Sequence, residues 1–236
     1  MTILQKQNQL ISTSQEGQIH IWTMTPIAKP IIIKKFDAPS SYVSCLIYNE
    51  SLDLIITGSN NNIHFWKNPM RWLLVQSINE HEGAIWALSI NQNENKLISC
   101  DWDRMIIITG RKIVLQKVFV EFYGYRPCFI DDDYFMYQLN KGTIILFQIL
   151  DNGNEIQNVK EIELTQRQKE CNAFFRCDTI IILKLRGQEQ IQIVQFIYFD
   201  SFNVFEKMND DSKLLATWDE SSKKIQIRKL VNYQQE

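Results

Sequence analysis

Hydrophobic and polar residues alternate along most of the chain with a period of two, which is the pattern of β-strands. Over Ala84–Asn91 (AIWALSIN) this alternation puts Ile85 and Ala87 on one side of a predicted strand. Trp86 and Leu88 then fall on the other side. Both sides are largely apolar, as expected for a sheet that lies between two other sheets. No stretch keeps a period of 3.6 residues, so the chain is predicted to be all-β.

One sequence unit recurs along the chain. LISTSQEGQIHIW at residues 10–22 and LIITGSNNNIHFW at residues 54–66 each run from an apolar start through a polar turn to Ile-His-apolar-Trp. The two copies lie 44 residues apart, which fits propeller blades of about 40–45 residues. A third copy, LISCDWDRMIIIT, occupies residues 97–109. Weaker copies follow at residues 135–147, 180–194 and 214–228.

These copies predict a single propeller domain of about six blades over residues 1–236. The approximate units are residues 1–36, 37–78, 79–119, 120–164, 165–201 and 202–236. Few residues precede the first copy or follow the last, so we expect a short first inner strand, a three-stranded final blade and an opening between the first and last blades. Unpaired edges of this kind invite pairing with another chain. A shortened relative of a seven-bladed protein is the second interpretation.

The third unit, HEGAIWALSINQNENKLISCDWDRMIIIT, resembles a nearly complete WD40 repeat of the G-beta-like β-propeller family. The chain's composition, rich in Asn, Gln, Ile and Lys, is also similar to that of ciliate WD-repeat proteins. In the WD40 family a His, a Ser or Thr, a turn Asp and a terminal Trp share hydrogen bonds. The resemblance implies such a structural network of His81, Ser99 and Asp103 here, with Thr109 at the Trp position.

The same resemblance implies a partner-binding rim, because the residue before the turn Asp lies on the face that WD40 proteins most often use to bind peptides. That residue is Trp102, Trp218 is its counterpart in the last unit, and Trp86 falls close to the same rim. Arg104, beside Trp102, could pair with an acidic partner. In the alternative interpretation these tryptophans are packed between blades. The predicted function is a non-catalytic scaffold for protein–protein interaction within a multiprotein complex.

Catalysis is not expected. The sequence has no G-x-S-x-G motif, and its eight glycines are too scattered for a phosphate-binding loop. The one acidic cluster, Asp131–Asp133, falls in a predicted turn, where we expect solvated acids. The alternative function is a propeller-type hydrolase or isomerase with a site in the central channel.

Net charge and cysteine content limit which partners and cofactors can be expected. The net charge is -2 without a basic stripe, so no direct nucleic-acid partner is expected. The five cysteines are scattered without C-x-x-C pairs, which argues against a disulfide framework, a zinc site or another metal or cofactor. No apolar run approaches the ~20 residues that span a bilayer, and the N-terminus lacks a secretory pattern. We therefore expect a soluble cytoplasmic protein, with the nucleus as the alternative location and no membrane partner.

Overall fold

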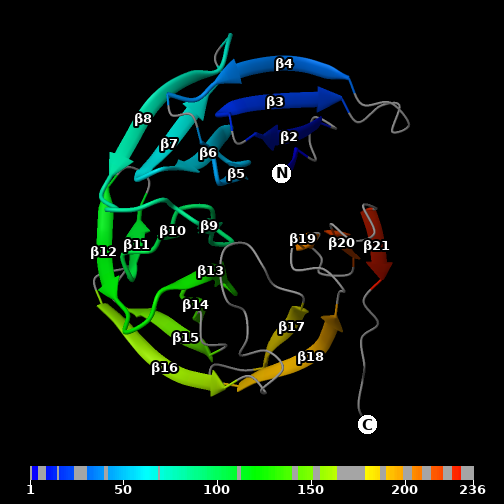
Figure 1. The fold of residues 1–236 in the computed structure, drawn as a ribbon. Coiled ribbons are helices and arrows are strands. Elements are labelled where there is room, and N and C mark those ends of the chain that lie inside the picture. The colour runs from blue at the N-terminus through cyan, green and yellow to red at the C-terminus, as the bar shows by residue number, and fades with distance from the viewer. Residues whose placement is uncertain are drawn as a thin grey trace. The chain divides into compact units, whose positions relative to one another are not determined.

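The computed structural model (Figure 1) describes residues 2–4, 9–14, 16–23, 31–39, 42–68, 70–110, 113–139, 143–150, 155–163, 179–186, 190–198, 204–208, 214–219 and 225–229. For residues 2–4 and beyond residue 161 only the backbone is described. The chain divides into two compact units, Met1–Glu163 and Leu164–Glu236.

The first unit contains four antiparallel sheets of four strands, in which strands consecutive in the chain pair with each other. The first sheet consists of β1 (Thr2–Leu4), β2 (Gln9–Thr13), β3 (Gln18–Thr23) and β4 (Ile32–Asp37). The second consists of β5 (Cys45–Asn49), β6 (Leu54–Ser59), β7 (Asn62–Lys67) and β8 (Leu73–Asn79). The third consists of β9 (Ala87–Ile90), β10 (Leu97–Cys100), β11 (Met105–Thr109) and β12 (Val114–Phe119). The fourth consists of β13 (Gly124–Phe129), β14 (Tyr134–Leu139), β15 (Thr143–Leu150) and β16 (Glu155–Glu163).

The described residues of the second unit form two smaller antiparallel sheets. One pairs β17 (Thr179–Arg186) with β18 (Gln190–Tyr198). The other has the order β19 (Val204–Met208), β20 (Leu214–Asp219) and β21 (Ile225–Lys229).

The predicted all-β class is confirmed. The described residues form strands and turns but no helix, so they contain no helix that could cross a membrane. The repeated sequence units are the central hairpins of the sheets: Leu10 pairs with Trp22 in the first, and Leu97 with Thr109 in the third. The first inner strand, β1, is short, with three residues, as expected. The last sheet has three described strands, and residues 230–236, which follow them, lie outside the described residues.

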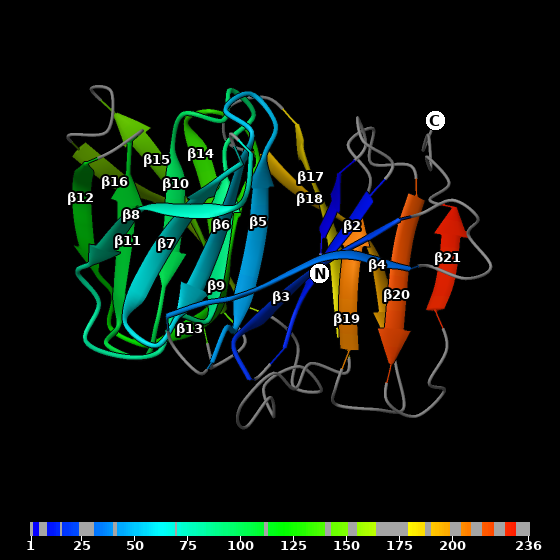
Figure 2. The same ribbon diagram turned by 90° about the horizontal axis from the view of Figure 1, so that it is seen from above.

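Three apolar clusters lie between consecutive sheets of the first unit. Figure 2 shows the strands of these sheets from above. Between the third and fourth sheets, Ile98 and Ile106 meet Phe135 and Phe147, whose rings are stacked with centroids 5.0 Å apart. Every residue of β10 and β11 is buried, because the third sheet is covered on both faces. Each fully buried Ile or Phe contributes about 1.5–3 kcal/mol to folding, so contact between sheets is a principal source of stability.

The simple alternation expected for residues 84–91 is wrong at its start. Ile85 and Leu88 share the cluster between the second and third sheets, whereas Trp86 and Ala87 contact the cluster on the opposite side. The reason is that β9 begins only at Ala87. Before that point the Ile85 N–H donates to Asn60 O in the turn of the second sheet, at 2.6 Å, which takes Ile85 out of the strand pattern.

Exposed apolar side chains gather on the outermost strands. Ile32 and Ile33 of β4 and Leu73, Leu74 and Val75 of β8 are each at least 40% exposed. In β4 they are followed by the exposed residues Lys34 and Lys35, and charged residues of this kind discourage edge-to-edge pairing. The three apolar residues of β8 lie in a strand without any charged residue. Pairing of an edge strand with another chain stays a prediction.

Acidic side chains tie the turns of neighbouring sheets together. Glu94, in the β9–β10 turn, accepts hydrogen bonds from the backbone N–H groups of Glu50 and Ser51 in the β5–β6 turn, at 3.0 and 2.5 Å. Asp132, in the β13–β14 turn, accepts from the Asn93 N–H at 2.8 Å and from Asn91 Nδ2 at 2.7 Å. The expectation of simply solvated acids in this turn is therefore wrong for Asp132, which is half-buried and joins two sheets.

Removal of this tie should weaken the fold. Asp132→Ala is expected to lower the free energy of unfolding by about 1–3 kcal/mol, because the side-chain amide of the buried Asn91 loses a charged acceptor. Asp133→Ala is the matched control: the exposed Asp133 carboxylate has only an ion pair with Lys96, at 2.8 Å, and such pairs contribute about 0–1 kcal/mol. Urea titration of both variants checks the difference, and equal losses would contradict the role of Asp132.

Candidate functional site

Three side chains predicted from the sequence to share hydrogen bonds come together at one end of the third sheet. His81 lies in the loop between β8 and β9, Ser99 on β10, and Asp103 in the tight turn between β10 and β11. The Ser99 hydroxyl lies 2.8 Å from His81 Nε2, and His81 Nδ1 lies 3.4 Å from Asp103 Oδ2. Carboxylate oxygens only accept hydrogen bonds, so we assign the ring hydrogen to Nδ1 and let Ser99 donate to Nε2.

A second carboxylate, Asp101, belongs to the same network and was missed by the sequence analysis. Its side chain is fully buried, and its Oδ2 lies 3.5 Å from His81 Nδ1. Asp101 Oδ2 also accepts from the Gly83 N–H at 2.8 Å, while Oδ1 accepts from the Asp103 N–H at 2.6 Å. A Cβ at residue 83 would lie 3.2 Å from Asp101 Oδ2, so glycine permits this approach. The Asp-x-Asp spacing was the available signal.

The two carboxyl groups hold the loop before β9 against the turn after β10. Asp101 binds the Gly83 N–H, and Asp103 Oδ2 accepts from the Glu82 N–H at 3.2 Å. Asp103 Oδ1 accepts from the Met105 N–H at 2.8 Å and so closes its own turn. Trp102 lies between the two acids in sequence, so its backbone is fixed on both sides.

The pKa values of the two acids shift in opposite directions. Burial disfavours the ionised form of Asp101, but hydrogen bonds with His81 and Asp103 outweigh this effect and lower its pKa. Burial and a hydrogen bond to Asp101 raise the pKa of Asp103 to about 6. Neighbouring carboxylates repel each other when both are ionised, so Asp103 loses its proton at a higher pH than an isolated aspartate.

These groups form a hydrogen-bonded network rather than an open metal centre. Ligand atoms of His81, Asp101 and Asp103 lie within 4.8 Å of one another, a spacing that could hold a metal ion. However, both His81 nitrogens have hydrogen-bond partners, and both oxygens of each carboxylate accept backbone N–H groups or contact His81. Ser99 is fully buried, so its hydroxyl cannot reach a substrate.

Aromatic rings surround Trp102 next to this network. Trp102 is 38% exposed, and its ring lies 5.2 Å from that of Trp86 and 5.5 Å from that of Tyr123, measured between centroids. Of the three tryptophans predicted for the rim, Trp86 is only 6% exposed and packs beneath the surface, whereas Trp102 reaches the surface. Arg104 is exposed, with φ of 62° in the tight turn. The backbone of Trp218 lies in β20, and its side chain is outside the described residues.

Residues 31–67 and 72–108 match the WD domain, G-beta repeat family, WD40. The chain contains WD40 repeats. It is also 29% identical over 92 residues to the 77 kDa echinoderm microtubule-associated protein of Strongylocentrotus purpuratus, a match that covers 38% of this chain and 13% of that protein. WD40 repeats generally form domains that bind other proteins, and members of the family are generally not enzymes.

The first three repeats of the sequence unit differ in how each satisfies its central hydroxyl. In the first two, the indole N–H of Trp22 donates to Ser12 Oγ at 2.8 Å, and that of Trp66 to Thr57 Oγ1 at 3.0 Å. In the third, Thr109 replaces the Trp, and its buried hydroxyl has no hydrogen-bond partner among the described residues. Ser99 is bound by His81 instead.

The unpartnered hydroxyl of Thr109 predicts a stabilising substitution. Thr109→Val keeps the shape of the side chain and removes the unsatisfied group, so the free energy of unfolding should rise by about 1 kcal/mol. Thr57→Val, its matched control in the second repeat, removes the acceptor of Trp66 and should lower that energy by about 1–3 kcal/mol. Thermal and urea denaturation measure both changes, and a loss of stability in Thr109→Val would show that its hydroxyl is bound.

The raised pKa of Asp103 predicts a pH dependence. The folded chain retains a proton near pH 6 that the unfolded chain releases near pH 4, so this group's stabilising contribution is complete below about pH 4 and declines until about pH 6. Relative to Asp103→Asn, which cannot ionise, wild-type stability should fall by up to about 3 kcal/mol across that window, at ~1.4 kcal/mol per pKa unit. Urea titrations at pH 4, 5, 6 and 7 test this, and a difference independent of pH would contradict it.

Proposed function

We propose that this chain is a non-catalytic scaffold that binds partner proteins through the rim formed by Trp102, Arg104 and the underlying Trp86. The main support for this proposal is that Trp102 is the one exposed tryptophan among the side chains described, and it lies in a WD40 turn. Tryptophan is enriched in binding hot spots, where one ring contributes about 2 kcal/mol or more.

The rim is also supported by its rigidity. Asp101 and Asp103 fix the turn on either side of Trp102, and the Val120 N–H donates to Arg104 O at 2.9 Å. A binding surface held in place before contact loses less conformational entropy when it binds. The rim therefore fits a role in recognition.

The same geometry disfavours the enzyme alternative. His81, Ser99 and Asp103 hold one another, and the Ser99 hydroxyl is buried away from solvent. Asp132 is engaged by Asn91 and Asn93. Each converging set of polar groups named here thus has a structural partner, which supports a scaffold. We also propose a cytoplasmic location, with the nucleus as the alternative, which imaging of the tagged chain would test.

Selection of binding peptides tests the proposed rim. A displayed random peptide library is selected on the immobilised chain, and recovered peptides are measured against wild type and Trp102→Ala. We expect Trp102→Ala to weaken binding at least tenfold, because a hot-spot tryptophan contributes about 2 kcal/mol or more. Polymerised tubulin serves as a second bait, because one relative is named as a microtubule-associated protein.

Phe119→Ala is the matched control, since Phe119 is an aromatic residue, 75% exposed, on the outer strand β12. It should leave binding unchanged. Circular dichroism of each variant confirms that the sheets remain folded. Peptides that bind wild type and Trp102→Ala equally well would rule out the rim as the interaction surface.

A further inference from the structure

Four aromatic rings form a closed cycle at the rim. Trp102 contacts Trp86 and Tyr123, with centroids 5.2 and 5.5 Å apart. Tyr125 closes the cycle, at 5.7 Å from Tyr123 and 6.2 Å from Trp86. The two tryptophans belong to the loops of the third sheet, and the two tyrosines to the start of the fourth, so the cycle bridges two sheets. The faces of aromatic rings carry partial negative charge and attract cations.

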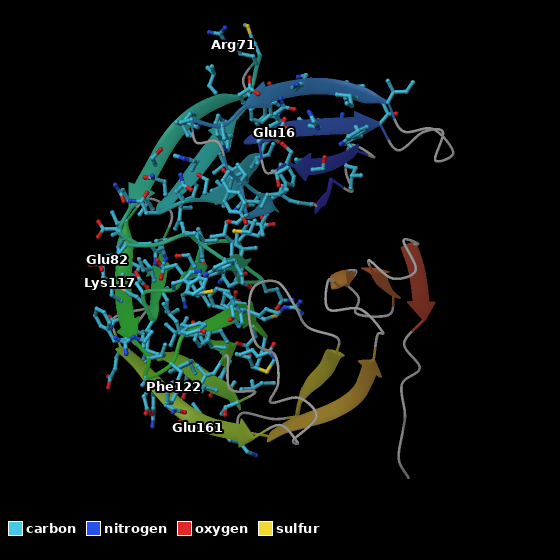
Figure 3. All side chains as sticks on the ribbon, in the orientation of Figure 1. Glu16, Arg71, Glu82, Lys117, Phe122 and Glu161 are labelled. Carbon is cyan, nitrogen blue, oxygen red and sulfur yellow. The ribbon has the colours of Figure 1, made fainter. Side chains whose placement is uncertain are left out.

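Two exposed glutamates, Glu82 and Glu121, lie close along the chain to residues of this cycle. Glu82 is exposed, and its N–H is bound to Asp103, the residue after Trp102. Glu121 is exposed two residues before Tyr123, which stacks on Trp102. Among the described residues neither glutamate forms an ion pair within 4.0 Å. Figure 3 labels Glu82 beside Lys117, but Lys117 is neutralised by Glu80, at 2.7 Å.

Arg126, directly after Tyr125, is half-buried. Among the described residues next to this cycle along the chain, Arg104 is the one exposed cation. It is a single positive group against two exposed carboxylates, so the local balance is negative. A positively charged group on a partner would gain attraction from Glu82, Glu121 and the aromatic faces together. A negatively charged group would gain from Arg104 alone. The charges therefore favour a cation as the occupant of this surface.

We propose that the aromatic cycle of Trp86, Trp102, Tyr123 and Tyr125 binds a basic side chain, the guanidinium of Arg or the ammonium of Lys, presented by an extended segment of a partner protein. This inference rests on the proposed function, because it names the chemistry of the partner at the same rim. The cation lies against the exposed parts of Trp102 and Tyr123, and the two glutamates stabilise it from the sides.

Fluorine NMR of the full chain labelled with 5-fluorotryptophan tests the proposal. The six tryptophans give separate probes, and Trp102→Phe assigns the resonance of Trp102. The probes are acetylated, amidated peptides Gly-Ser-X-Ser-Gly, in which X is Arg or Lys, or the neutral analogues citrulline or acetyl-lysine. We expect the Arg and Lys peptides to shift the Trp102 resonance saturably, with a Kd on the order of millimolar. The peptides with the neutral analogues should give no saturable shift.

Charge variants make the test sharper. Glu82→Gln and Glu121→Gln should each lower the affinity for the Arg and Lys peptides about two- to fivefold. Arg104→Gln should raise this affinity by a similar factor. Glu161→Gln is the matched control, because Glu161 is an exposed glutamate on β16 (Figure 3) and should have no effect. A Trp102 resonance that shifts equally with Arg and citrulline, or affinities unchanged in both rim glutamate variants, would overturn the proposal.

The outcomes separate this inference from the proposed function. Library peptides that require Trp102 but are not enriched in Arg or Lys would leave the rim as the interaction surface. They would overturn only the proposal that the rim binds a basic side chain. Peptides that bind independently of Trp102 would overturn both. Enrichment in basic residues, lost in Trp102→Ala, would support both.

Discussion

Two carboxyl groups, of the buried Asp101 and the half-buried Asp103, fix the loop that enters the third sheet to the turn that follows its second strand. They do so through the backbone N–H groups of Gly83 and Glu82 and through His81. Because Trp102 lies between the two acids, the same bonds that close the turn set the position of the exposed indole. The rim, its aromatic neighbours and its charges all depend on this constraint.

The cost of this constraint is electrostatic. Two acids share one histidine in a buried site, and the repulsion between them is relieved when Asp103 keeps a proton, as its raised pKa indicates. The first two repeats avoid this cost by using an indole N–H to bind the central hydroxyl, through Trp22 and Trp66. The third repeat has Thr109 in place of that indole, and a second acid close to its histidine. We infer that its network holds the loop of the rim at some expense of stability.

Much of the fold could be predicted from the sequence, because strand alternation and the recurring hairpin are local patterns. The contact of His81, Ser99 and Asp103 could also be expected, since it follows from a repeat motif. Asp101 could not, because its role depends on the loop that folds back onto it. The orientation of Trp86 was mispredicted for a similar reason: Ile85 bonds to the turn of another sheet, and this interrupts the alternation. The tie made by Asp132 likewise depends on a neighbouring sheet.

We propose that the selected peptides bind at the rim around Trp102. Hydrogen–deuterium exchange of the full chain, with and without a saturating selected peptide, tests this claim most directly. We predict that slower exchange on binding is confined to the backbone amides of residues 80–86, 101–104 and 120–125. Protection that instead covers β4 or β8, with the rim unchanged, would show that the peptide binds along the outer strands.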